Sequence, residues 1–202
     1  DEAIMGNGAI VGDMKAWAEA SRASRKRGAA VVPGGGEHRA MTLCAVLLTQ
    51  KLLDLDYSGS LSLTEHAVPV GRGNNSSISG IDVIDDSYNA NPQSMASSLE
   101  NFRNRKVEGR KVIVLGEMLE LGSASRQEHE KIANYFSSFD KVFTVGDGFK
   151  EVAGSEWRDK GDFELIEAIN KYLCPGDSVL VKGSNRVFWT NKFVDRLTES
   201  LN

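Results

Sequence analysis

The stretch VIDDSYNANPQS, residues Val83 to Ser94, places two acids, a tyrosine, two asparagines and a proline directly behind a short apolar run. A strand that ends in an ordinary turn needs only one or two such residues. The apolar run indicates a buried strand, and Asn91 followed by Pro92 is typical of the cap and first position of a helix. The stretch therefore predicts a strand, a polar turn and a helix, with more polar groups than the turn requires.

Further apolar runs rich in valine and isoleucine follow along the chain, and segments with helical spacing separate them. This alternation predicts an α/β fold with a Rossmann-like, mostly parallel sheet and helices on both faces. Ligands bind such sheets outside the carboxyl ends of the strands, so we expect the strand ends to form a site. The four runs are IDVID (81–85), KVIVLG (111–116), KVFTVG (141–146) and DSVLVKG (177–183).

The helical segments carry capping and periodicity signals. Ser125 to Glu128 has the spacing of a capping box. His129 is in phase with Ile132 and Phe136, which favours a partly buried, hydrogen-bonded histidine over a catalytic base. Residues 187–201 read as one closing amphipathic helix. The helix before it is expected to bury Phe163, Ile166, Ile169 and Leu173.

The first 80 residues are less regular. Residues 39–55 predict a strongly apolar, buried helix, and GRGNNSSISG (71–80) predicts a hairpin or a linker ahead of the next strand. We expect a domain boundary near residue 70. The buried face of the helix is expected to hold Met41, Cys44, Ala45, Leu48 and Leu52.

Composition places the chain among ordinary globular proteins. It has 202 residues, a net charge of -4, 41% hydrophobic and 26% charged residues. This charge predicts binding to neither nucleic acid nor a membrane surface. Cys44 and Cys174 lack metal-ligand spacing, so two reduced, buried thiols are expected. With no long apolar run and no basic leader in view, we expect a cytoplasmic protein.

The polar strand ends allow functional and structural interpretations. Alternation predicts that Asp85 and Asp86 face opposite sides of the sheet. Such a carboxylate can accept ribose hydroxyls or help to hold Mg²⁺, or it can begin an Asx turn or be solvated. Asn89 and Asn91 offer amides, although Asn91 is first a helix cap. Lys182 lies at a strand end that suits an anion.

Several common motifs are missing from the sequence. There is no G-x-x-x-x-G-K-[ST] segment, so the chain has no P-loop for a triphosphate. There is also no G-x-S-x-G, and no G-x-G-x-x-G follows a strand. These absences leave hydrolase and dinucleotide-binding interpretations unsupported.

Four segments together resemble the C-terminal domain of the Mur ligase family. They are IDDSYNANPQSM (84–95), VIVLGEMLELG (112–122), His129 and LVKGS (180–184). Within that family the sequence is most similar to the ligases that join D-alanyl-D-alanine to UDP-N-acetylmuramoyl-tripeptide. The resemblance implies a cytoplasmic, monomeric enzyme of peptidoglycan biosynthesis that uses ATP and Mg²⁺ and works through an acyl phosphate.

The resemblance also implies roles for individual residues. On the ATP side, Asp86 would hold the ribose hydroxyls, Arg72 would reach the phosphates from the hinge, and Tyr88 and Asn89 would line the cleft. No catalytic residue and no metal ligand is assigned within this chain. On the D-alanyl-D-alanine side, the implied residues are Asn91, Ser94, Lys182 and Ser184.

At the level of the whole chain, the resemblance implies two parts. Residues 1–70 would be a remnant of the central ATP-binding domain without its P-loop, and residues 71–202 the C-terminal domain. Such a chain is expected to be inactive alone, with Mg²⁺ held mainly by the missing domain. Arg39 and Thr42 stand where the family usually has asparagines near the adenine. The alternatives are a non-catalytic Rossmann-like binding module, or a Mur-family ligase with another amino substrate.

Overall fold

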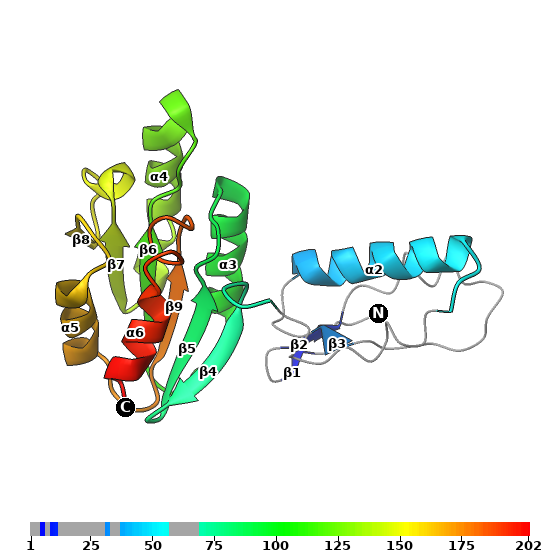
Figure 1. Ribbon diagram of the computed structural model, residues 1–202, viewed down its shortest axis with the longest axis horizontal. Coiled ribbons are helices and arrows are strands. Elements are labelled where there is room, and N and C mark those ends of the chain that lie inside the picture. The colour runs from blue at the N-terminus through cyan, green and yellow to red at the C-terminus, as the bar shows by residue number, and fades with distance from the viewer. Residues whose placement is uncertain (1–4, 7–8, 12–30, 33–36, 57–68) are drawn as a thin grey trace. The chain divides into compact units, whose positions relative to one another are not determined.

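The computed structural model describes residues 5–6, 9–11, 31–32, 37–56 and 69–202. The chain divides into two compact units, Asp1–Val68 and Pro69–Asn202. The division falls two residues before the boundary expected from the sequence. Figure 1 draws the elements of both units with their labels.

The first unit contains three short strands and one long helix among its described residues. The strands pair antiparallel in the order β1-β2-β3. Their bounds are β1 (Met5–Gly6), β2 (Ala9–Val11) and β3 (Val31–Val32), and the helix is α2 (Glu37–Leu52).

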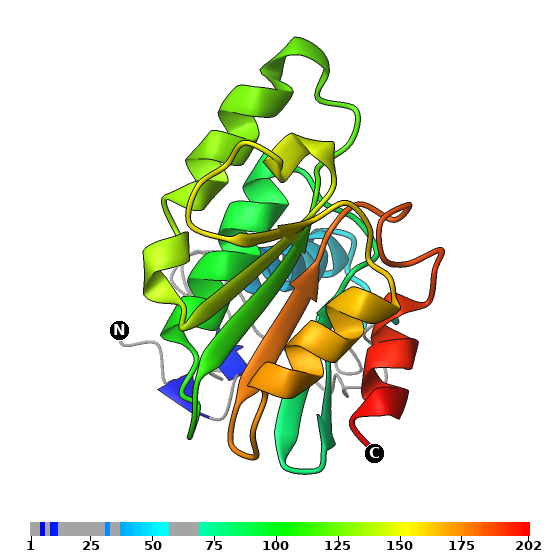
Figure 2. The same cartoon turned by 90° about the vertical axis from the view of Figure 1, so that its left-hand side faces the viewer.

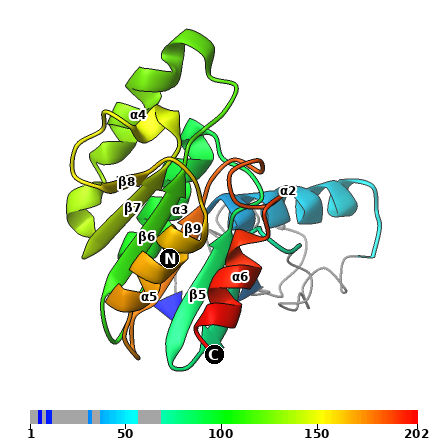
Figure 3. The same cartoon turned by 60° about the vertical axis from the view of Figure 1, so that its left-hand side comes forward.

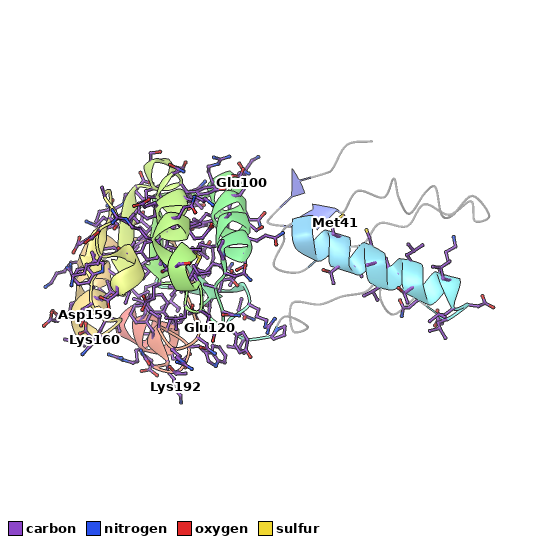
Figure 4. All side chains as sticks on the ribbon, turned by 90° about the horizontal axis from the view of Figure 1, so that it is seen from above. Met41, Glu100, Glu120, Asp159, Lys160 and Lys192 are labelled. Carbon is purple, nitrogen blue, oxygen red and sulfur yellow. The ribbon has the colours of Figure 1, made fainter. Side chains whose placement is uncertain are left out.

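Helix α2 exists as predicted, but its buried face is a different one. Leu43 and Leu47, one turn apart, are the buried residues. Met41, labelled in Figure 4, is 62% exposed, and Leu48 and Leu52 are also exposed. The expected face was wrong because α2 is apolar on nearly all sides, so its spacing does not single out one stripe.

The second unit is built on a six-stranded sheet with the order β4-β5-β9-β6-β7-β8. Only the edge strand β4 runs antiparallel to its neighbour, so the predicted, mostly parallel sheet is confirmed. The strands are β4 (Asn74–Ile78), β5 (Ile81–Asp86), β6 (Lys111–Gly116), β7 (Lys141–Val145), β8 (Glu156–Arg158) and β9 (Ser178–Lys182).

Strands β4 and β5 form a hairpin, which decides between the two interpretations of residues 71–80. Ile78 pairs with Ile81, leaving a two-residue turn. Ser79 and Gly80 both have positive φ, at 51° and 77°. A turn of this kind matches the twist of the strands that it joins.

Helices cover both faces of this sheet (Figures 2 and 3). One core cluster packs α5 and α6 against Val83, Val114 and Val181, and the other packs α3 and α4 against Ile84, Ile113 and Leu180. Alternate residues of each strand therefore serve opposite helix layers. The helices are α3 (Pro92–Asn104), α4 (Ser125–Ala133), α5 (Phe163–Tyr172) and α6 (Phe193–Ser200).

The two predicted caps have different outcomes. Asn91 caps α3, its side chain accepts from the Ser94 amide, and Pro92 occupies the first turn, as expected. The box from Ser125 to Glu128 does not form. A 3₁₀ turn at 122–124 runs directly into α4, so Ser125 is already helical and no side chain caps the helix.

Three smaller expectations are corrected. Phe163 is 63% exposed, and Leu165 is buried in its place, because Phe163 is the first residue of α5. The closing helix begins at Phe193 rather than 187, since the preceding residues form a loop that buries Phe188. Neither thiol is buried, because Cys174 is exposed and Cys44 is partly exposed.

Candidate functional site

The polar strand ends gather at one edge of the sheet, as the parallel topology requires. Asp86 is in register with Lys182 across β5 and β9, and Leu115 of β6 is in register with the same lysine. Gly116 pairs with Val145 at the end of β7. The segments that follow these four strands therefore start side by side at the carboxyl edge (Figure 2).

Asp85 shapes the turn after β5. Its Oδ1 accepts hydrogen bonds from the Ser87 amide at 3.1 Å and the Ser87 hydroxyl at 2.5 Å. Burial raises the pKa of the Asp85 carboxyl above its ordinary value, and the two bonds from Ser87 oppose that rise. The predicted Asx turn is thus the role that Asp85 fills in this structure.

Asp86 faces the opposite side, toward α3. Its Oδ2 accepts from the Ser98 hydroxyl at 2.5 Å and from Lys182 Nζ at 2.8 Å. Lys182 Nζ also lies 3.2 Å from the carbonyl oxygen of Asn89. The side chain of Asp86 is 20% exposed and that of Lys182 only 3%. Residues that the resemblance assigns to two different ligands are therefore in direct contact.

An aromatic cluster lies beside the turn. The Arg72 guanidinium carbon is 4.4 Å from the centre of the Tyr88 ring. At this distance the electron-rich face of the ring attracts the positive charge. Tyr88 in turn meets Trp189 edge to face, with ring centres 5.4 Å apart. Gly71 has φ of 77°, and a Cβ there would lie 2.6 Å from the Trp189 ring. Trp189 therefore packs directly on the backbone that carries Arg72.

Trp189 is a residue that the sequence reasoning missed. It lies within residues 187–201, whose pattern predicts one amphipathic helix, and an aromatic residue there ordinarily indicates core packing. Its contact with Tyr88 depends on the loop that replaces the first turns of that helix. No local pattern identifies this contact.

The remaining polar residues of the turn serve the start of α3. Asn89 Oδ1 accepts from the Ala90 amide at 2.9 Å, and Asn89 is exposed. The side chains of Asn91 and Ser94 bond to each other's backbone amides at 2.8 and 3.1 Å. Asn91 and Ser94 thus make a reciprocal capping box, which uses the groups predicted to meet the dipeptide.

The loop after β6 is fixed by side chains from other elements. The Met118 amide donates to His129 Nε2 at 2.9 Å, and the Leu119 amide donates to Ser184 Oγ at 2.9 Å. Glu117 Oε2 accepts from the Gly148 amide at 3.0 Å. This loop, residues 117–119, is therefore tied to α4, to the end of β9 and to the segment after β7.

His129 is buried, more deeply than expected, and acts as an acceptor. Its Nδ1 lies 2.7 Å from the Ser125 carbonyl oxygen, so Nδ1 carries the proton and Nε2 is free to accept from Met118. Burial lowers the pKa of the imidazole below its ordinary value of 6.5, although the Ser125 carbonyl and the carboxylates of Glu117 and Glu128 oppose this effect. A neutral, structural histidine results.

The described residues offer little to a metal ion. Among them, no group of three or more His, Cys, Asp or Glu side chains is placed to share one. Asp85 and Asp86 face opposite sides of the sheet, and Glu117 is bonded to the Gly148 amide. Glu120, labelled in Figure 4, is exposed in the loop after β6 with φ of 67°. The described helices also include none long and apolar enough to cross a membrane.

Comparison with known proteins identifies the family. Residues 71–185, more than half of the chain, match the family described as Mur ligase, glutamate ligase domain. The chain belongs to the Mur ligase family. The matched region begins at Gly71, beneath Trp189, and ends just beyond Lys182 and Ser184, so it contains most of the carboxyl edge.

Curated relatives of this Mur ligase chain share one name, UDP-N-acetylmuramoyl-tripeptide--D-alanyl-D-alanine ligase. The protein of Rickettsia prowazekii (strain Madrid E) is 33% identical over 165 residues, which cover 77% of this chain and 36% of the relative. The protein of Bacillus subtilis (strain 168) is 33% identical over 119 residues, which cover 52% of this chain and 26% of the relative. The chain thus spans about a quarter to a third of the length of these relatives.

Solved Mur ligases share the fold. A MurF ligase from Thermotoga maritima in complex with ADP matches with a TM-score of 0.74 at 19% identity, covering all of this chain and 46% of that one. A MurF from Acinetobacter baumannii matches with a TM-score of 0.70 at 25% identity, covering 85% of this chain and 40% of that one. The α/β fold and the resemblance read from the strand ends are confirmed.

Proposed function

We propose that this chain is the C-terminal part of an ATP-dependent ligase that joins D-alanyl-D-alanine to UDP-N-acetylmuramoyl-tripeptide in peptidoglycan biosynthesis. The observation that carries the proposal is the 33% identity over 165 residues to a ligase of that name. In this proposal residues 1–70 are the end of the central ATP-binding domain, and residues 71–202 are the C-terminal domain. The chain alone would be inactive.

The reaction needs an activated carboxylate and an aligned amine. Phosphoryl transfer from ATP converts the terminal carboxylate of the tripeptide into an acyl phosphate. The amine of D-alanyl-D-alanine then attacks that carbonyl, the C–N bond forms, the nitrogen loses a proton to solvent, and phosphate leaves with the electrons of the broken C–O bond. Most of the rate gain in such a step comes from alignment and from charges fixed in advance. The C-terminal domain would contribute by closing over the nucleotide.

The accessible groups of the edge suit the nucleotide side of this proposal. Arg72, Tyr88 and Asn89 are exposed. Arg72 carries a fixed positive charge and lies over the Tyr88 ring, and no carboxylate of the described residues forms an ion pair with it. A guanidinium placed in this way suits phosphate oxygens. Asp86 retains partial exposure beside them, which suits a ribose hydroxyl.

The residues assigned to the dipeptide side have less freedom. Asn91 and Ser94 cap α3, while Lys182 and Ser184 are buried. We extend the proposal to a cytoplasmic, monomeric enzyme whose Mg²⁺ is held mainly by the segment that carries the P-loop. The family resemblance supports these points.

The test is phosphate release from ATP in the presence of UDP-N-acetylmuramoyl-tripeptide. It compares this chain alone with this chain joined to its natural upstream sequence, each with and without D-alanyl-D-alanine. The proposal expects release that requires the dipeptide and that occurs only in the longer protein. L-Glutamate in place of the dipeptide is the matched control for a ligase with another amino substrate.

Two outcomes would replace the proposal. Release that depends on L-glutamate, but not on D-alanyl-D-alanine, would indicate a Mur ligase with a different amino substrate. No release in the longer protein with either amine would favour a non-catalytic, Rossmann-like binding module.

A further inference from the structure

Lys182 is a charged side chain in a place where charges are rare. It ends the central strand β9 and is 2% exposed. Lysines are almost never buried to this extent unless they are paired. The pair here is Asp86, with Nζ and Oδ2 2.8 Å apart, and the Asn89 carbonyl is a second acceptor.

Stability alone is a weak reason for such a pair. A buried ion pair is often no more stabilising than two apolar side chains of similar volume, because both charges lose their hydration. The neighbouring residues on the same face are apolar, with Leu180 and Ile84 in the core cluster. An apolar residue at 182 would continue that cluster. The pair therefore points to a requirement other than folding.

The geometry of Asp86 indicates what that requirement is. Lys182 from β9 and Ser98 from α3 both donate to Oδ2 of the Asp86 carboxylate. Within the described part of the chain, Oδ1 accepts no hydrogen bond. Two donors on one oxygen hold the carboxylate in a single orientation and leave the other oxygen available.

We propose that Lys182 is a positioning residue for Asp86 rather than a contact for the incoming dipeptide. This inference rests on the proposed function, in which Asp86 accepts a ribose hydroxyl of ATP. The ammonium holds the Asp86 carboxylate in one orientation and directs Oδ1 outward before the nucleotide arrives. Its bond to the Asn89 carbonyl ties the turn after β5 to the same strand end. Binding of the dipeptide by Lys182 would first have to break the pair and leave Asp86 without its charge partner.

The test uses the full-length ligase with Lys182→Met, which keeps the length of the side chain and removes its donors. The KM for ATP is expected to rise about 10-fold or more, as for the loss of a charge-assisted hydrogen bond. The KM for D-alanyl-D-alanine is expected to stay within about 2-fold, because no direct contact with the dipeptide is lost. Ser98→Ala removes the other donor to Oδ2 and should also raise the KM for ATP, by a smaller factor than Lys182→Met.

A second measurement remains valid if Lys182→Met folds poorly. It compares kcat/KM for ATP with kcat/KM for 2′-deoxy-ATP and 3′-deoxy-ATP within each variant, so the fraction of active enzyme cancels. The unaltered protein should discriminate against at least one analogue by about 10-fold, the worth of a hydrogen bond to a charged group. Lys182→Met should lose most of that discrimination. A lysine that only stabilised the fold would lower all three values equally.

Lys171→Met is the matched control, because Lys171 is 77% exposed and is also paired with a carboxylate, that of Glu167. It should leave both KM values and the discrimination ratio unchanged. A raised KM for D-alanyl-D-alanine with an unchanged KM for ATP in Lys182→Met would overturn the proposal, as would retained discrimination. Failure of the proposed function is distinct, because the unaltered full-length protein would then show no dipeptide-dependent phosphate release.

Discussion

The turn after β5 and the loop after β6 both follow parallel strands at the carboxyl edge of the sheet, but they make different contacts. The turn leaves the side chains of Tyr88 and Asn89 exposed, and Arg72, which precedes β4 and lies over the Tyr88 ring, is exposed beside them. In the loop, the amides of Met118 and Leu119 are already bonded to side chains from other elements. The comparison teaches that a polar strand end can present groups to a ligand or serve as a scaffold for its neighbour. Asp86 joins the two roles, since it is both paired and partly exposed.

The largest effect on stability is expected where these roles meet. Asp86→Ala leaves Lys182 buried without its charge partner, and the free energy of unfolding should fall by about 3–5 kcal/mol. Urea unfolding of the chain, followed by circular dichroism, measures this change. The double variant Asp86→Ala/Lys182→Met removes both charges and should recover most of the loss. A double variant as unstable as the single one would contradict the assignment of the pair as the cause.

The next effect tests the scaffold. His129→Ala leaves the Met118 amide without its acceptor and opens a cavity beside Phe149, so the free energy of unfolding should fall by about 2–4 kcal/mol. The matched control is His129→Gln, which can still accept a hydrogen bond and should lose less. Equal losses in the two variants would show that the hydrogen bond to Met118 does not matter.

The same histidine predicts a dependence on pH. Burial lowers the pKa of His129, so the folded state binds the proton less tightly than the unfolded chain does. The free energy of unfolding should therefore be fully retained above pH 6.5 and fall as the pH drops below that value. The difference between the unaltered chain and His129→Gln isolates this effect, since His38 and His66 remain in both. Parallel stability curves between pH 7.5 and 5.5 would rule it out.

The smallest effect on stability, with a clear effect on activity, is expected at Arg72, which lies beside the turn after β5. Arg72→Ala removes an exposed side chain, so the free energy of unfolding should change by no more than about 0.5 kcal/mol. In the full-length ligase the KM for ATP should rise by roughly 10-fold or more, because a charge-assisted contact to phosphate is lost. Arg103→Ala, at an exposed pair with Glu100 on α3, is the control and should change neither quantity. An unchanged KM for ATP in Arg72→Ala would show that Arg72 does not contact the nucleotide.

Strands β5, β6, β7 and β9 and the helices α3, α4 and α5 could be predicted because their signals are local, whereas the three-residue strand β8 was not predicted. Runs of valine and isoleucine mark the buried strands, and Asn91 with Pro92 marks the start of α3. The buried face of α2 could not be predicted in this way, because an apolar helix has no unique stripe. The predicted cap at Ser125 was wrong for a different reason. A 3₁₀ turn precedes α4 and continues into it, so Ser125 is already part of the helix.

For the candidate site, local patterns in the sequence were enough to predict that the polar strand ends share the carboxyl edge. They also predicted that Asp85 and Asp86 face opposite layers, because side chains alternate along a strand. Only the tertiary structure decided their partners. Asp86 meets Lys182 across 96 residues of chain, and Ser184 meets Leu119 across 65. These contacts depend on β9 lying between β5 and β6 in one particular register. Strand order and register come from the packing of the whole sheet, and no local pattern carries that information.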